Sequence, residues 1–480
     1  MNHLIPTRFP EVGKTISLPS VRSLGRVRTL ARLACTAAVL GWAGWLPAQD
    51  LPTPAAPGLP AQPVLELLPQ EVGPATMIGN ENAAPEMSAA EPAAVEAAET
   101  ADAVLEAPNP GPPASRWKVL PHIDLQVMWD DNIFIQANNE ISDFLFRATP
   151  GLTLGYLDDE ARLERFLDRQ QRASRAVQFD GNFFLLDYTP SYVVFLENDA
   201  ENSFDQEARF EARWQLQKLS LSAQAAFLSR NETNIDIGRR LRHTAYNVGL
   251  SARYQFTERT SADLGGFYLS DEFEDAPGNV ELRSEAYVNY ELTPRVQVSL
   301  GLAVGQVEVE QAPSQTFERI LARGSYSITD KVSVRAQGGV EFRQFDGGRD
   351  QINPIFELDL LYVPAELTTV GVGFYRRVIP SFSLPEDSVE TMGVTVNFSR
   401  DLQAGLRLLA AAGYQKNQFS STGATEERTD EFFFGRIGVL YNFANWGSAG
   451  LNYEYRNNDS TRSISGFTNN QITLDLSLTF

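Results

Sequence analysis

The chain has 480 residues, enough for one large domain with appended segments, and its 61 Asp and Glu against 40 Lys and Arg give a formal net charge of −21. This acidic balance argues against a nucleic acid as partner, because nucleic-acid sites depend on clustered positive charge. The single cysteine, Cys35, lies in a segment that we expect to be removed, which excludes disulfides, thiolate zinc sites and cysteine nucleophiles from the mature chain.

Residues 1–48 have the pattern of a Sec-type signal peptide. Four arginines between positions 22 and 32 precede the apolar run "LACTAAVLGWAGWL" at 33–46, and Ala48 offers a small residue for cleavage. An uncleaved membrane helix is the alternative, although the apolar run is short for one. We therefore expect export from the cytoplasm.

Residues 49–115 differ in composition from everything that follows. Thirteen of the chain's 27 prolines lie between 50 and 115, with many alanines and no Lys or Arg before Arg116. Such a segment buries too little apolar surface to offset its ordering entropy, so we expect a disordered linker. After export it would be an N-terminal arm in the periplasm, either a spacer or a contact for a partner or peptidoglycan.

Residues 116–480 alternate between apolar and polar positions. In "VQVSLGLAVG" (296–305) the valines and leucines share one face, and "QITLDLSLTF" (471–480) repeats the pattern. A period of two predicts β-strands with one apolar and one polar face. No run of 18 apolar residues follows position 50, so a helical membrane anchor is not expected there.

A fixed interval recurs in the middle of the chain. Tyr254, Tyr290, Tyr326, Tyr362 and Phe398 are each 36 positions apart, and a short polar turn follows each aromatic residue. Two strands of about 12 residues with one short and one longer connection account for this interval, so the repeating unit is a β-hairpin. Strict alternation of short and long connections is typical of outer-membrane barrels, whose periplasmic turns are tight.

We therefore predict an all-β fold: a transmembrane, antiparallel, up-and-down β-barrel of about 18 strands, with 16 strands as the alternative. An even number of strands leaves both ends of the barrel on the periplasmic side, and closure removes the unpaired edges that lipid could not satisfy. The expected strands are 119–130, 143–156, 182–196, 206–216, 219–229, 243–256, 261–270, 280–292, 296–308, 316–328, 332–344, 354–363, 368–378, 388–398, 403–415, 431–443, 448–456 and 470–480.

An outward-facing aromatic residue is expected near the end of every strand that runs into a short turn. Amphipathic rings prefer the membrane–water boundary, so these residues would form an interfacial girdle. The final aromatic residue on an alternating strand is also the signal that the barrel-assembly machinery reads in outer-membrane barrels. The predicted girdle consists of Tyr156, Trp214, Tyr254, Tyr290, Tyr326, Tyr362, Phe398, Tyr441 and Phe480.

The same alternation places charged side chains on the inner face, so we expect a water-filled lumen. Cross-strand pairing of arginines with carboxylates is the simplest role for each charge. The functional alternative is a field across a pore that sorts solutes by charge. The candidate pore-lining residues are Arg147, Arg209, Arg213, Arg253, Arg283, Arg319, Arg323, Arg335, Arg377, Arg407, Arg436, Glu285, Glu341, Glu357 and Asp359.

Catalysis finds little support in the sequence. The histidines are His3, His122 and His243, and no nucleophile elbow, metal-spaced histidine pair or phosphate loop accompanies them. We therefore expect no enzyme, no catalytic residue, no metal and no cofactor.

Residues 158–176 interrupt the alternation. Arginines at 162, 165, 169, 172 and 175 recur at three- and four-residue steps, which predicts one side of a helix on the periplasmic side. A solvated, self-paired helix is the default. A basic lid at the pore mouth and an extension of the flanking strands are the alternatives.

"DLQVMWDDNIFIQ" at 124–136 resembles the aromatic-Asp-Asp-Asn-x-Phe motif, here at 129–134, of a family of outer-membrane β-barrel porins often encoded with exopolysaccharide or capsule export genes. "LLDYTPSYVVFLEN" at 185–198 is also similar to that family. The resemblance implies an outer-membrane barrel that passes polysaccharide or small solutes. From the residues alone, Asp130, Asp131 and Asn132 could hold calcium, although a tight turn capped by Asx side chains is favoured.

The sequence thus predicts a porin-like channel in the outer membrane of a Gram-negative bacterium, for passive passage of small hydrophilic solutes. The alternatives are a pore for exopolysaccharide export and a structural, partner-binding barrel without an open pore. Expected partners are outer-membrane lipid and lipopolysaccharide, the barrel-assembly machinery, and a periplasmic export partner if the export hypothesis holds.

Overall fold

The computed structural model describes residues 117–157, 182–346, 349–365, 367–383, 388–402, 405–420 and 428–480. The predicted signal peptide, the predicted linker and the arginine-rich stretch at 158–176 lie outside the described residues. No helix within the described part of the chain is long and apolar enough to cross a membrane.

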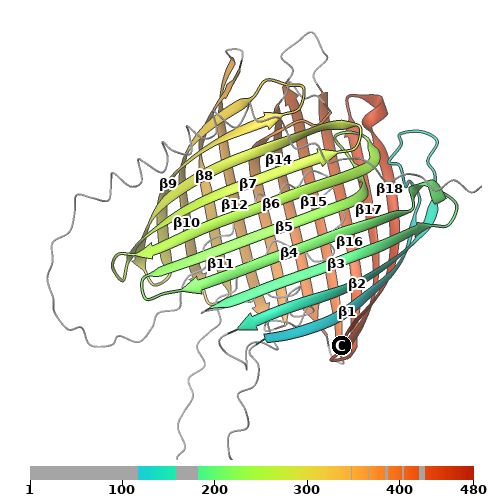
Figure 1. Cartoon of the computed structure of the whole chain (residues 1–480), viewed down its shortest axis with the longest axis horizontal. Coiled ribbons are helices and arrows are strands. Elements are labelled where there is room, and N and C mark those ends of the chain that lie inside the picture. Colours follow the sequence, from blue (N-terminus) through green and yellow to red (C-terminus); the bar gives the residue numbers. More distant parts are fainter. Residues whose placement is uncertain are drawn as a thin grey trace, which may run out of the picture. The chain divides into compact units, whose positions relative to one another are not determined.

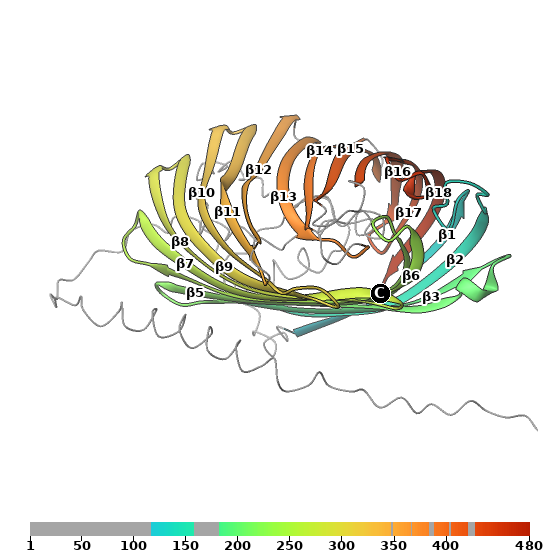
Figure 2. The same cartoon turned by 90° about the horizontal axis from the view of Figure 1, so that it is seen from above.

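The described chain forms one antiparallel sheet of 18 strands (Figures 1 and 2). The strands are β1 (Trp117–Asp130), β2 (Asp143–Leu157), β3 (Phe183–Phe195), β4 (Ser203–Gln215), β5 (Leu219–Asn234), β6 (Arg239–Gln255), β7 (Thr260–Phe273), β8 (Ala276–Thr293), β9 (Val296–Val309), β10 (Gln315–Thr329), β11 (Val332–Phe345), β12 (Arg349–Ala365), β13 (Thr368–Pro380), β14 (Ser388–Asp401), β15 (Leu406–Ser420), β16 (Arg428–Ala444), β17 (Gly447–Ser460) and β18 (Phe467–Thr479). Two short 3₁₀ helices are described, η1 (Asp199–Glu201) and η3 (Ser463–Ser465).

Each strand pairs with the next in the chain, and β1 also pairs with β18. The β1–β18 register runs from His122 opposite Thr479 to Asp130 opposite Gln471. This last pairing closes the sheet into a barrel and leaves no strand with a free edge. The predicted closed barrel of 18 strands is confirmed, and the 16-strand alternative is wrong.

The predicted long connections are partly wrong. The strands continue beyond the expected boundaries, so β5 and β6 are joined by only residues 235–238 and β7 and β8 by only residues 274–275. The registers show why: Asn234 stands opposite Arg239, and pairing on β7–β8 continues to Phe273 opposite Ala276. Polar residues at these ends continue the hydrogen-bonded ladder, because backbone groups pair whatever their side chains are.

The wall of the barrel is apolar outside and largely polar inside. On β9, Leu300 and Leu302 are 71% and 61% exposed, whereas Ser299 and Ala303, which flank this pair, are 5% and 2% exposed. The same alternation runs round the barrel: the large exposed apolar side chains of the strands lie mostly on the outward-facing, alternate positions. A soluble protein would bury these residues, so the outer surface requires an apolar solvent.

Candidate pore lining

All fifteen candidate pore-lining residues lie on the inward faces of their strands. Exposed apolar side chains occupy neighbouring positions beside many of them, such as Phe146 beside Arg147 and Ile320 beside Arg319. Arg209 is 45% exposed although it faces inward, so the lumen around it has room for water. Alternation alone thus brings these residues to the lumen.

Ion pairs across neighbouring strands hold many of these charges. Glu341 on β11 is fully buried and contacts Arg319 on β10 at 2.7 Å and Arg343 on its own strand at 2.8 Å. Arg343 also donates to the side-chain oxygen of Gln315 at 2.7 Å. A buried carboxylate is tolerated here because two guanidinium groups offset its desolvation.

A second cluster involves four strands. Arg253 on β6 forms a two-pronged pair with Asp263 on β7, at 2.7 and 3.0 Å. Arg323 on β10 reaches the same carboxylate and donates to Asn289 at 2.9 Å. Its guanidinium lies 3.8 Å from the centre of the Tyr287 ring, so an aromatic face and an acid together fix its position.

Further pairs distribute charge round the wall. Arg436 contacts Glu454 at 2.5 Å, Arg283 contacts Glu281 at 2.8 Å, and Arg407 pairs with Asp401. Other inward residues are positioned by register or by rings: Arg335 stands opposite Asp359 and Gln337 opposite Glu357, while Arg377 lies over Tyr375 and Arg213 over Phe183. Glu285 faces the lumen on β8, between Arg283 and Tyr287 on the inward face.

The nine predicted girdle residues lie near the end of the barrel at which β4 is joined to β5, β6 to β7 and β8 to β9. Eight are on the outward faces of their strands, and Phe480 follows β18 with 68% of its surface exposed. Trp117, which lies outside the predicted girdle, packs against Tyr156 with ring centres 5.0 Å apart and ring planes tilted by 46°. Its place at the start of the first alternating segment could have identified it, and the register puts it opposite Tyr156.

Sequence reasoning missed a second set of outward aromatic residues towards the other end of the barrel. On β6 and β16, members of the two sets are eight residues apart, at Tyr246 and Tyr254 and at Phe433 and Tyr441. Eight residues span about 27 Å along a strand, or about 20 Å across a membrane at the usual tilt. The second set consists of Phe144, Phe204, Tyr246, Tyr268, Phe342, Phe356, Phe374, Tyr414, Phe433 and Tyr453.

The connection after β1 folds into the barrel. Ile133 and Ile135 in this connection are almost fully buried, and Ile135 packs with Ile235, Phe432 and Phe467. Ile135 lies in the connection after β1 and Ile235 in the connection after β5, whereas Phe432 belongs to β16 and Phe467 to β18. At this level, therefore, connections meet side chains of the wall inside the barrel.

The Asp-Asp-Asn motif fastens this connection to β18. Asp130 accepts hydrogen bonds from the Asn132 backbone at 2.9 Å and from Gln471 at 2.7 Å, and it also pairs with Asn469. Asp131 accepts from the backbone and side chain of Asn470, at 2.7 and 2.6 Å. N–H groups thus occupy these carboxylates, which is the geometry of an Asx-capped turn.

No protein-family model matches the sequence, and no curated protein matches it. Several solved structures match the chain with low scores. OpdK of Pseudomonas aeruginosa, whose structure was determined with vanillate, is 13% identical with a TM-score of 0.38, covering 75% of this chain and 99% of that one. OpdQ of the same organism is 12% identical with a TM-score of 0.41, covering 76% of this chain and 97% of that one. OccAB4 of Acinetobacter baumannii is 11% identical with a TM-score of 0.40, covering 77% of this chain and 100% of that one. At these values the similarity supports no conclusion about function.

Proposed function

We propose that this protein is a channel of the bacterial outer membrane that passes small hydrophilic solutes through its lumen. The observation that carries the proposal is the inverted wall: leucine, valine and aromatic side chains face outward, and paired arginines and carboxylates face inward. An apolar outer surface suits a lipid bilayer, and closure satisfies the backbone groups that lipid cannot. A polar lumen suits hydrated solutes, and rings of charge give such a pore a preference for ions of one sign.

Insertion into lipid would place the two aromatic sets at the two membrane interfaces. The short turns would then face the periplasm, together with the N-terminal arm that the sequence predicts. Lipid, lipopolysaccharide and the barrel-assembly machinery, acting through β18, are the partners that this arrangement requires.

A pore for exopolysaccharide export is the second candidate. The connections that meet inside the barrel support it, because a polymer pore must be closed when no polymer is passing. The resemblance around residues 129–134 points the same way. A periplasmic apparatus would then be a further partner.

Conductance in planar lipid bilayers tests the proposal. The purified full-length protein is expected to give steady, stepwise current in potassium chloride and to speed the swelling of liposomes in small sugars. A protein that inserts, shown by protection of the strands from protease, but carries neither current nor sugar would contradict the channel function. Current that depends on a periplasmic partner would favour the export pore.

A further inference from the structure

The connection between β5 and β6 reaches across the barrel. Residues 235–238 join these two strands, and their contacts lie on residues 381–383, which follow β13, and on Arg428, which begins β16. In the ring of 18 strands, β5 and β14 are nine strands apart in both directions, so they stand on opposite walls. The β5–β6 connection therefore meets a connection from the opposite side of the ring rather than covering only its own edge.

The local geometry makes this connection a tight, rigid turn. The Asn234 carbonyl accepts from the Gly238 amide at 2.7 Å, and the Asn234 side chain accepts from the Ile237 amide at 3.0 Å. Gly238 has a φ of 78°, a conformation in which a glycine is least strained. The turn projects Ile235 and Asp236 from the end of the β5–β6 hairpin.

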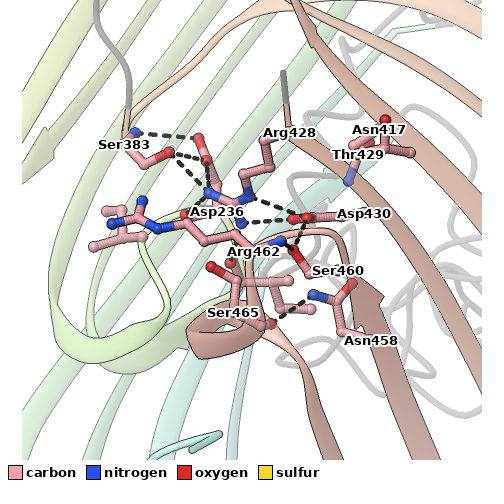
Figure 3. A network of polar contacts seen from close by, with 12 residues as sticks. Asp236, Ser383, Asn417, Arg428, Thr429, Asp430, Asn458, Ser460, Arg462 and Ser465 are labelled. Atoms are coloured by element: carbon pink, nitrogen blue, oxygen red, sulfur yellow. Dashed lines mark hydrogen bonds and ion pairs between the residues drawn. The ribbon is translucent and has the colours of Figure 1, made fainter. Parts of the chain in front are cut away.

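Asp236 occupies a site built for an anion (Figure 3). Its Oδ2 accepts from the Phe382 amide at 2.7 Å, the Ser383 amide at 3.3 Å and the Ser381 hydroxyl at 3.2 Å. Its Oδ1 accepts from the Ser383 hydroxyl at 2.5 Å and lies 3.5 Å from the Arg428 guanidinium. Two amides, two hydroxyls and one guanidinium thus converge on one carboxylate, which gives a strong, charge-assisted site.

Arg428 is the rigid centre of this site. Its side chain is 3% exposed, pairs with Asp430 through two nitrogens, and lies over the Phe419 ring with 4.4 Å to the ring centre. Its Nη1 also donates to the Asp236 carbonyl at 2.9 Å and to the Ser383 hydroxyl at 3.1 Å. The guanidinium keeps its place through Asp430, so Asp236 can leave without dismantling the wall.

Next to Asp236, Ile235 is 1% exposed and completes the apolar cluster with Ile135, Phe432 and Phe467. The polar side chains at this level are also buried, including Gln315, Gln415 and Asn469 at 1%, 1% and 0% exposed. Arg209, further towards the short turns, is by contrast 45% exposed. The β5–β6 connection therefore meets closely packed side chains inside the barrel.

We infer that residues 235–238 form a latch that closes the lumen, with Asp236 as a tethered ligand in an anion site made by residues 381–383 and Arg428. The latch regulates the channel and so rests on the proposed function. Release of Asp236 frees the turn from the far wall and opens the solute path.

The test compares Asp236→Ala with Asp459→Ala, which removes an exposed carboxylate on the outer face of β17. Both are made in a Cys35→Ser, Ile135→Cys background, where position 135 reports on the apolar cluster. We expect a water-soluble maleimide to label this cysteine at least about tenfold faster in the Asp236→Ala protein than in the Asp459→Ala protein or in the background protein that keeps Asp236. The reason is that Asp236→Ala removes charge-assisted hydrogen bonds. Ser383→Ala, which removes one hydroxyl, should give an intermediate rate.

Equal labelling rates in the background, Asp236→Ala and Asp459→Ala proteins would overturn the latch, provided that each is folded as judged by its heat-dependent migration in SDS gels. Bilayer current decides the channel separately. Larger or more frequent openings with Asp236→Ala support both proposals. Unchanged current with unchanged labelling overturns the latch and leaves the channel, and faster labelling without current in any variant supports the latch and overturns the channel.

Discussion

Glu341 is a carboxylate without exposed surface, held between Arg319 and Arg343 inside the barrel. Glu341→Ala leaves two buried guanidinium groups without this partner, so we expect the free energy of unfolding to fall by about 3–5 kcal/mol. Urea unfolding in detergent, followed by tryptophan fluorescence, measures the loss.

The matched control for Glu341 is Glu258→Ala, in the exposed turn between β6 and β7. It should change the unfolding midpoint little, because an exposed carboxylate in solvent adds almost nothing to stability. A Glu341→Ala protein as stable as this control would show that the pairing on β10 and β11 does not stabilise the barrel.

Arg209 is the lumen charge whose substitution tests solute selection most directly, because its side chain is half-exposed to the lumen. Arg209→Glu should shift the permeability ratio towards cations by up to about fivefold at low salt, and less at high salt as the charge is screened. Reversal potentials across a potassium chloride gradient measure this ratio. Arg209→Lys preserves the charge and should leave it unchanged; an equal shift in both variants would contradict selection by charge.

At the scale of single strands, β9 tests the direction of the wall. Leu300→Arg puts a charge on the outward face, where lipid would meet it, and should lower stability by about 2–4 kcal/mol if the site lies near the middle of the bilayer. Gln297→Arg, an inward position on the same strand, should be tolerated. Refolding yields into lipid vesicles compare the two variants, and the opposite order would refute a lipid-facing outer surface.

The Asp-Asp-Asn motif fastens one end of the seam between β1 and β18. Asp131→Ala deprives the backbone and side chain of Asn470 of their acceptor, so stability should fall by about 1–3 kcal/mol. The shift in the temperature at which the folded band disappears from SDS gels measures this change. Asp199→Ala, on the exposed η1 helix, is the control, and an identical shift in both proteins would argue against the role of the motif at this seam.

The strands were predictable because their signal is local. In "VQVSLGLAVG", alternation alone assigned Leu300 outward and Ser299 inward, and the structure agrees. Strand ends were less predictable: residues 230–234 and 239–242 read as a polar loop, yet they pair as strand because backbone ladders tolerate polar side chains.

At the scale of the whole molecule, contacts between distant segments were beyond the sequence pattern. The pairing of Arg323 with Asp263 depends on the order of β7 and β10 in the ring, and alternation gives only the face on which each residue lies. The contact of Asp236 with Ser383 and Arg428 depends on the direction in which one short turn projects. Residues 235–238 are four positions in a stretch that predicts only a loop, so no period could reveal that they meet a connection from the opposite side of the ring.

The whole-barrel prediction concerns passage. If the latch closes the lumen, wild-type channels should be shut for most of the recording time, and Asp236→Ala should raise the open fraction several-fold, because the charge-assisted contacts to the far wall are worth at least about tenfold in the opening equilibrium. Single-channel dwell times measure this fraction. Asp459→Ala should match wild type, and long openings in wild type of the same amplitude and frequency as in Asp236→Ala would contradict the expectation.

The closing register between β1 and β18 sets an order on biogenesis. β18 lies more than 330 positions after β1 in the chain. One edge of β1 therefore keeps its amide and carbonyl groups unpaired until almost all the other strands are in place. A half-made sheet would expose two such edges to lipid, where each group without a partner carries a large penalty. Folding of the barrel must therefore be close to all-or-none, and a chaperone or assembly factor has to shield both free strand edges until the first and last strands pair.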